Sequence, residues 1–237
     1  CTLMFISQKR HKGKDIDFSQ LSSRPRDPAW GGVSLVIKEG KLDAFREANC
    51  GIGLHWGGTV KCEDTRDPYA VAEAQRQAFQ KTERDRTLLE EGGYELYYAP
   101  RLGIRESRRV VGEYIITVND LKEGNITEDV VALDEYAIDT WGQKIEEDKI
   151  WIPTTGIHYR SLIARETANL LLAGKSISGS HLACSSYRVQ PVVAGIGQAA
   201  GCAAALAVAK NTSIRKIPVD NLQKQLVEMS VLEEKYI

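Results

Sequence analysis

Asn169-Leu170-Leu171-Leu172-Ala173-Gly174 is a short apolar run that ends in glycine, a pattern typical of a buried parallel strand. A loop of small residues follows, and then an Ala- and Gly-rich run that carries no charge from Val189 to Ala209. Because Pro191 suits the first turn of a helix, the pattern predicts a helix over 190–210. The start of such a helix offers backbone N–H groups to an acceptor atom or an anion. The same pattern also fits a buried strand–helix unit that holds no ligand.

The rest of the chain predicts a mixed α/β fold in two parts. In residues 1–160, short apolar runs predict strands, and Asp67-Pro68 opens a helix that runs to Glu91 and stops at Gly92-Gly93. Residues 128–133 suggest a short helix. In residues 161–237, a terminal amphipathic helix is expected over 218–235, after the strand at 169–174 and the helix at 190–210.

Composition excludes several classes of partner. The 237 residues carry 31 Lys and Arg against 32 Asp and Glu, so the net charge of −1 does not attract nucleic acid or an anionic membrane. The five cysteines and four histidines are scattered without metal-ligand spacing, so no metal site is expected. Because the cysteine count is odd and the separations are large, we expect a reducing, cytoplasmic compartment.

The uncharged run from Val189 to Ala209 is long enough to cross a bilayer, and Gly197-x-x-x-Gly201 is a packing pattern of membrane helices. The run is mostly Ala, Gly and Val, however, so it is only weakly hydrophobic. A helix that packs closely on a sheet needs the same composition. We therefore expect a soluble protein with no membrane segment, in which Gly197 and Gly201 allow close helix–sheet contact. A phosphate loop is excluded here because the spacing is GxGxxxG and lies inside the helix.

Four arginines stand close together in residues 101–109, before a run of β-branched residues. Guanidinium groups bind carboxylates and phosphates through paired hydrogen bonds. In an extended segment Arg101 and Arg105 share one side, whereas Arg108 and Arg109 face opposite ways. Composition alone favours a solvated charge cluster, paired with Glu106 and Glu113, over an anion site.

Several motifs recur together in a known order: Arg105–Tyr114, Ile157–Leu162, Asn169–Ser178, and Arg188–Pro191 followed by Gly197–Gly201. In these motifs the chain resembles the bacterial FAD-dependent oxidoreductases of the glutathione-reductase-like superfamily. The order and spacing match from about residue 1 to the C-terminus. Some positions depart from the family pattern: Lys175 and Gln190 stand where Arg and Met are commoner, and Thr140-Trp141 stands where many relatives carry His. If that His acts in the substrate chemistry of the relatives, this branch acts differently or on another substrate.

The resemblance implies FAD as cofactor and two domains, an FAD domain with a parallel sheet and a substrate domain with a mixed or antiparallel sheet. It places the ribityl chain and flavin ring beside two segments of the C-terminal part. Ser185 stands where its side chain adds a donor to this site. The expected cofactor-binding residues are Gly174, Lys175, Ser176, Ile177, Ser178, Ser185, Arg188, Gln190, Pro191 and Val192.

In such proteins an N-terminal βαβ unit with a GxGxxG loop holds the ADP portion of FAD. The sequence contains no GxGxxG, and it opens on the apolar run Cys1–Ile6 without an initiator Met. We therefore expect the chain to be the C-terminal half of such an enzyme, needing an N-terminal half or a partner chain to bind FAD.

The expected reaction is hydride or electron transfer between a small organic substrate and FAD. The resemblance places the Arg105/Arg108 segment near the flavin or the substrate, where either guanidinium would hold an anionic group of the substrate. His158 and Tyr159 are the candidate proton-transfer groups. The alternative is a non-catalytic subunit or scaffold fragment. An oligomer is compatible with both.

Overall fold

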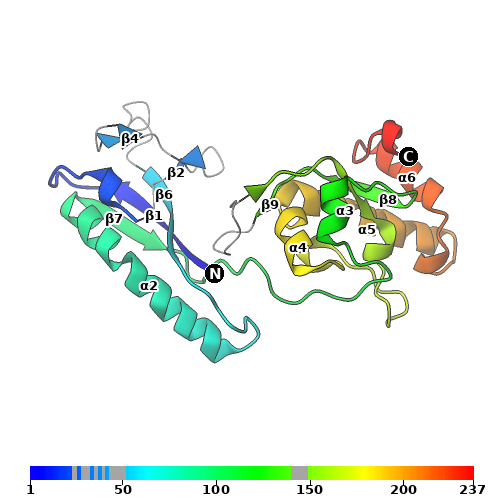
Figure 1. Cartoon of the computed structure of the whole chain (residues 1–237), viewed down its shortest axis with the longest axis horizontal. Helices are drawn as coiled ribbons and strands as arrows, with labels where there is room; N and C mark the ends of the chain where they lie inside the picture. The colour runs from blue at the N-terminus through cyan, green and yellow to red at the C-terminus, as the bar shows by residue number, and fades with distance from the viewer. Residues whose placement is uncertain (23–25, 28–32, 35–36, 39–40, 43–51, 140–148) are drawn as a thin grey trace. The chain divides into compact units, whose positions relative to one another are not determined.

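The computed structural model describes residues 1–22, 26–27, 33–34, 37–38, 41–42, 52–139 and 149–237. The chain forms two compact units, Cys1–Arg105 and Glu106–Ile237 (Figure 1). Residues 106–160, which the sequence groups with the N-terminal part, therefore belong to the second unit. The predicted mixed α/β fold is confirmed.

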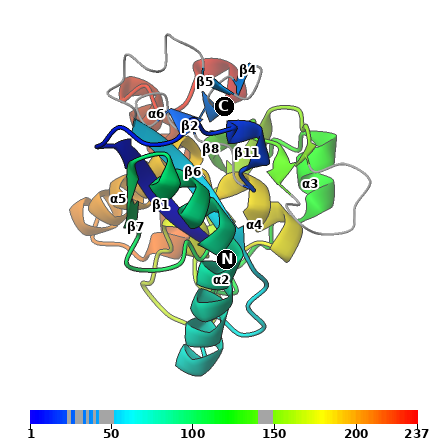
Figure 2. The ribbon, with the colours of Figure 1, turned by 90° about the vertical axis from the view of Figure 1, so that its left-hand side faces the viewer.

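The first unit is built on a five-stranded sheet with the order β3-β2-β6-β1-β7. Strand β1 lies inside this sheet and pairs antiparallel with β6 and β7, and these three strands lie side by side in Figure 2. Because alternate side chains of a strand face the same side, Leu3, Phe5 and Ser7 are all buried, at 0%, 1% and 2% exposure. The strands of this unit are β1 (Thr2–Lys9), β2 (Arg26–Asp27), β3 (Val33–Ser34), β4 (Ile37–Lys38), β5 (Lys41–Leu42), β6 (Ile52–Thr59) and β7 (Tyr94–Tyr98), of which β4 and β5 pair separately.

One long helix, α2 (Pro68–Glu91), covers the buried face of this sheet. The Asp67 side chain accepts a hydrogen bond from the backbone N–H of Tyr69 at 2.9 Å and so caps the helix start. The chain leaves the helix through Gly93, which has a φ of +82°. Both ends are therefore as the sequence predicts.

The second unit is organised around α5 (Gln190–Ala209). This helix packs on strand β8 (Val130–Asp134) and on α6 (Val219–Glu228), and β8 pairs antiparallel with β11 (Thr155–His158). Helix α4 (His181–Tyr187) contacts β9 (Ile138–Asp139), which pairs with β10 (Lys149–Ile150), and α3 (Val118–Glu123) contacts α4 and β11. Apolar side chains from these elements share one core.

The predicted helix over 190–210 is confirmed, whereas the terminal helix ends at Glu228 and not at 235. It ends early because Ser230 adopts a left-handed conformation with a φ of +57°. The prediction of a helix over 128–133 is wrong, since Val130–Asp134 forms the strand β8. A short apolar run fits a strand and a buried helix equally well, and here the pairing with β11 makes this run a strand.

The prediction of a strand over 169–174 is also wrong. Asn169 has a left-handed φ of +53°, and Gly174–Ser176 forms a turn of 3₁₀ helix. Between them only Leu171 bridges to Ile163, in antiparallel orientation. Among the described residues the single parallel bridge joins Ile116 to Gly179, so no parallel sheet forms within this part of the chain.

One side of α5 faces the core and the other faces outward. Ile196, Ala199 and Ala203 are fully buried, whereas Val208 is 82% exposed. Gly197 and Gly201 lie on the exposed side, and a Cβ at either would meet no atom within 4 Å. Their expected role in close helix–sheet contact is therefore wrong for the two described units. By length and composition α5 would also suit a membrane span, but 39% of its most apolar window is buried in its own unit.

Candidate functional site

The segment Gly174–Ser178 is held by backbone hydrogen bonds from two other parts of the second unit. The N–H of Val110 donates to Ser176 O at 3.1 Å, and that of Ile116 donates to Ser178 O at 3.1 Å. On its other side, Ser178 donates its own N–H to Ser161 O at 3.1 Å. The run that carries the arginines and the run at 157–162 are thus both in contact with the expected cofactor segment.

Gly174 opens this segment with a φ of +70°, a conformation that glycine adopts at no steric cost. A Cβ at Gly174 would meet no atom within 4 Å, so the backbone here borders open space. Another group can therefore approach the main chain closely at this position.

Ser178 has a buried hydroxyl that no described residue partners. The residue is 1% exposed, and its Oγ makes no hydrogen bond to the part of the chain that the structure describes. An unsatisfied buried hydroxyl costs roughly 1–3 kcal/mol, so a bound group with acceptor atoms would recover this loss. The ribityl hydroxyls and ring carbonyls of a flavin are such acceptors, and the residues present fit that end of FAD.

Helix α4 joins the Gly174–Ser178 segment to the start of α5. Ser180 caps α4 by accepting from the N–H of Ala183 at 3.3 Å, and Tyr187 at its other end donates its hydroxyl to Ile177 O at 3.3 Å. Tyr187 is fully buried, and burial raises its phenol pKa far above the ordinary value, so the hydroxyl stays a donor. These contacts hold the two expected cofactor segments at a fixed separation.

The start of α5 lacks a side-chain cap. Val189 occupies the N-cap position and accepts no hydrogen bond with its side chain. Pro191 removes one N–H from the first turn, whereas those of Gln190 and Val192 have no partner inside the helix by geometry. Gln190 and Pro191 are exposed, and Val192 is 7% exposed. Because Gln190 is exposed, a hydrogen-bond acceptor can reach the first turn, at the positive end of this 20-residue helix.

The other expected cofactor residues are placed as follows. Arg188 ends α4 and contacts Asp139, with 3.3 Å between its Nη2 and the Asp139 Oδ2. Ser185 donates its hydroxyl to Leu182 O at 2.7 Å, within its own helix. Lys175 is exposed. Arg188 is thus oriented by a carboxylate, while Ser185 is satisfied locally.

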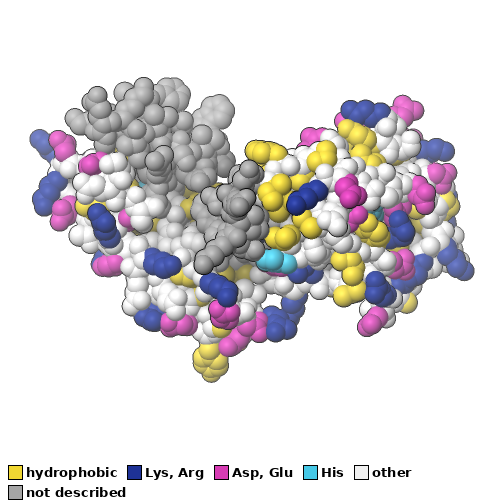
Figure 3. Space-filling view, viewed as in Figure 1, with side chains coloured by type: hydrophobic (Ala, Val, Ile, Leu, Met, Phe, Trp, Pro, Cys, Tyr) yellow, Lys and Arg dark blue, Asp and Glu magenta, His cyan; other side chains and the backbone are white. Residues whose placement is uncertain are grey.

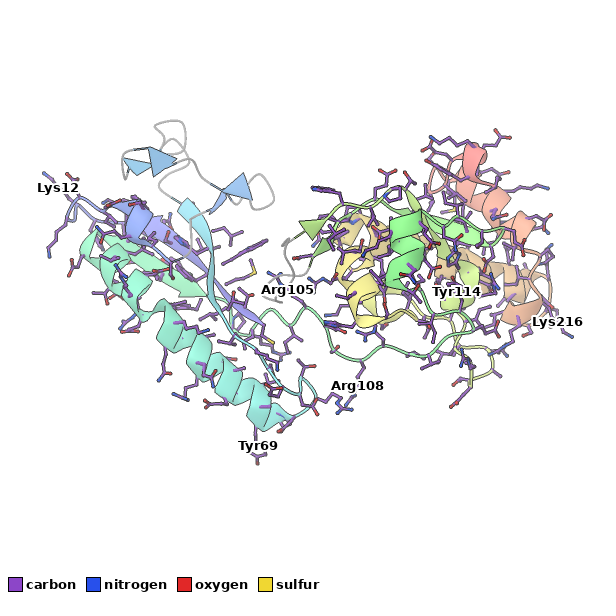
Figure 4. The ribbon with its side chains drawn as sticks, viewed as in Figure 1. Lys12, Tyr69, Arg105, Arg108, Tyr114 and Lys216 are labelled. Carbon is purple, nitrogen blue, oxygen red and sulfur yellow. The ribbon has the colours of Figure 1, made fainter. Side chains whose placement is uncertain are left out.

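The candidate substrate arginines fall in different units. Arg105 belongs to the first unit, where its guanidinium lies 5.5 Å from the ring centroid of Trp56. Arg108 belongs to the second unit, is exposed and projects from the extended segment (Figure 4).

The candidate proton-transfer residues both lie in the interior of the second unit. His158 is fully buried; its Nδ1 lies 2.7 Å from Thr127 Oγ1, and its ring lies 4.5 Å from that of Tyr114. Tyr159 donates its hydroxyl to Ile214 O at 2.8 Å, and burial raises its pKa to about 12. In these positions both side chains hold the fold together.

The structure brings three other polar side chains to the candidate site. Arg109 donates from Nε to Gly179 O at 2.9 Å and pairs with Glu106, and Glu106 also contacts Nδ1 of His181, the first residue of α4. The alternation of side chains along 105–109 separates Arg109 from Arg108, but sequence alone does not show which side faces the site. The pairing of residues 106 and 181 has no local sequence signal.

Charged and hydrophobic side chains are intermixed over the visible face of the second unit (Figure 3). Within the described ranges, no group of three or more His, Cys, Asp or Glu side chains is arranged to hold a metal ion.

Comparison with known proteins identifies the family. No curated protein and no solved structure matches the chain. The family model described as FAD dependent oxidoreductase matches residues 29–226, which covers most of both units. FAD is the cofactor of that family, in agreement with the open helix start and the buried hydroxyl of Ser178. The chain belongs to the family of FAD-dependent oxidoreductases.

Proposed function

We propose that this chain forms the flavin-facing part of an enzyme that transfers a hydride or electrons between a small organic substrate and FAD. One observation carries the proposal. The uncapped start of α5 and the Gly174–Ser178 segment are tied together through α4, in a chain of the FAD-dependent oxidoreductase family.

The proposed flavin residues act by binding and electrostatics. FAD itself supplies the redox chemistry when bound. The N–H groups of Gln190 and Val192, at the positive end of α5, would stabilise negative charge on the ring edge that they face. The Ser178 hydroxyl would donate to the ribityl chain or a ring carbonyl, and Gly174 would allow close approach of the main chain.

We further propose that the substrate carries an anionic group. Arg105 or Arg108 would bind it through paired N–H donors, since a guanidinium matches a carboxylate in geometry and charge. We do not propose proton transfer by His158 or Tyr159, because both are buried and Tyr159 donates to a backbone carbonyl.

The ADP portion of FAD would be held outside the segments named above. The sequence contains no GxGxxG, which normally places the pyrophosphate at a helix start. We propose that a further N-terminal segment or a partner chain supplies this contact. The alternative is a subunit that binds no flavin itself, and the lack of a phosphate loop favours that alternative.

Titration of the 237-residue chain with FAD and with riboflavin separates these possibilities. If the chain holds only the flavin end, the two ligands should bind weakly and with similar affinity in calorimetry. FAD binding that is more than about 100-fold tighter, or about 2.7 kcal/mol, would mean that the ADP end is also held here. Failure of both ligands to bind, even with the N-terminal portion added, would overturn the flavin assignment.

Variants of α5 locate the site within the chain. Val189→Asp would add a carboxylate that caps the helix start and competes for the N–H of Val192, so flavin affinity should fall about tenfold or more. Val208→Asp adds the same charge to the exposed far end of α5 and is the matched control. Equal flavin affinity of the two variants would show that the start of α5 does not touch the ring.

A further inference from the structure

We propose that His181 is a proton-transfer residue of the flavin site and that Glu106 is the residue that positions it. The proposal rests on the flavin site proposed above and adds a proton-transfer group to it. It is supported by two ion pairs that share Glu106, one with His181 and one with Arg109. These three side chains come from two separate stretches of the second unit.

His181 lies between the two proposed flavin segments. It is the first residue of α4, three residues after Ser178, and the last turn of α4 leads to Arg188. Residues seven apart lie two turns along the same helix face, so His181 and Arg188 share a side of α4. The imidazole is therefore on the face of α4 that carries a proposed flavin contact.

The imidazole is accessible, and its orientation is fixed. Its side chain is 56% exposed, whereas that of Glu106 is 26% exposed and that of Arg109 is 23% exposed. Glu106 contacts Nδ1 of His181, and Arg109 anchors Glu106 while donating to Gly179 O. A carboxylate on Nδ1 favours the tautomer with a proton on Nδ1, so Nε2 becomes the basic atom.

The surroundings of His181 favour the neutral imidazole over the imidazolium. Burial, Arg109 and Arg188 lower the pKa of His181 below its ordinary value. Glu106 acts in the opposite direction, and Asp139 offsets the charge of Arg188. A neutral imidazole with a basic Nε2 can accept a proton.

The proposed step balances as an alcohol or amine oxidation. Bound FAD would supply the acceptor for a hydride from the substrate carbon, and Nε2 of His181 would take the proton from the attached oxygen or nitrogen. A C=O or C=N bond forms, and the proton later leaves His181 to solvent, which its exposure allows.

The first test measures the tautomer and the pKa of His181 directly, by ¹⁵N NMR of the FAD-loaded protein. His181 should carry its proton on Nδ1 and titrate below the ordinary histidine pKa. In Glu106→Gln the pKa should fall further, by roughly 1 unit, because the imidazolium loses its carboxylate partner. A proton found on Nε2 in the unchanged protein would overturn the positioning role.

The second test measures the midpoint potential of bound FAD against pH. The slope should change at the NMR-determined pKa of His181, and His181→Gln should remove that change while FAD loading persists. His11→Gln is the matched control, because His11 is also exposed and lies 3.8 Å from a glutamate, Glu95, in the first unit. An identical profile in His181→Gln and the unchanged protein would refute the role of His181 and leave the flavin site standing. Failure of the unchanged protein to bind FAD, even with the N-terminal portion added, would instead refute the proposed function.

Discussion

Replacing Gly197 by Ala should stabilise the second unit. Gly197 lies in the interior of α5, where glycine costs about 0.5–1 kcal/mol relative to alanine because the unfolded chain loses more freedom. The added Cβ would meet no atom within 4 Å, so no steric penalty offsets this gain. Gly201 has the same open surroundings, and the double variant should gain about 1–2 kcal/mol.

Amide hydrogen exchange is the suitable assay, because a chain of two units need not unfold in one step. The amides of Ala199 and Ala203, both fully buried, report the opening of α5. Their exchange should slow about two- to fivefold in Gly197→Ala, which corresponds to the gain of about 0.5–1 kcal/mol.

Gly197→Leu makes the test decisive. If Gly197 contacts a sheet, as its spacing suggests, leucine should overpack the contact and cost about 1–3 kcal/mol. If this face of α5 is exposed, leucine should be about as stabilising as alanine, since both are good helix formers. Faster exchange at Ala203 in both variants would refute the reasoning and show that this face is packed in the folded protein.

Other substitutions test the scaffold of the site. Burial would raise the pKa of Asp120, but hydrogen bonds led by the Tyr114 hydroxyl outweigh it and hold the pKa at about 2. The Asp120 carboxylate therefore stabilises the folded state above about pH 4, and this stabilisation is lost as the pH falls toward 2. In Asp120→Asn the free energy of unfolding should vary with pH by roughly 2 kcal/mol less over this range, as measured by acid unfolding. Tyr159→Phe should cost about 1 kcal/mol in urea unfolding and leave FAD binding unchanged. Ser186→Ala removes a 2.8 Å bond to buried Asp134 and should cost about 1–3 kcal/mol.

Each of these three predictions has an outcome that would contradict it. An acid transition that is the same in Asp120→Asn would mean that this carboxylate carries no pH-linked stability. Weaker FAD binding in Tyr159→Phe, with stability preserved, would return that hydroxyl to the candidate site. Unchanged unfolding of Ser186→Ala would show that Asp134 finds another donor.

Sequence patterns predicted those elements whose signals are local. Helix α2 is bounded by an Asp-Pro start and a Gly-Gly end, and α5 by a Pro in its first turn, so their limits follow from neighbouring residues. The motif at Gly174–Ser178 likewise pointed to the segment that the structure places beside α4. Short apolar runs were less informative, since Val130–Asp134 is a strand and 169–174 is not. Whether such a run becomes a strand depends on pairing partners elsewhere in the chain.

Side-chain roles depended most on long-range contacts. Sequence alone does not separate a buried His158 from an exposed His181, since burial depends on packing against distant elements. The same holds for Arg109, whose partner carbonyl at Gly179 lies 70 residues away.

The amino-acid sequence by itself determined the family, the cofactor and the two best-defined helices, because motif spacing and helix ends are local properties. Only the tertiary structure decided the boundary after Arg105, the outward direction of Gly197 and the pairing of Glu106 with His181. These three depend on which distant segments share a core. That choice is made by the burial of apolar surface over the whole unit and not by any short run of residues.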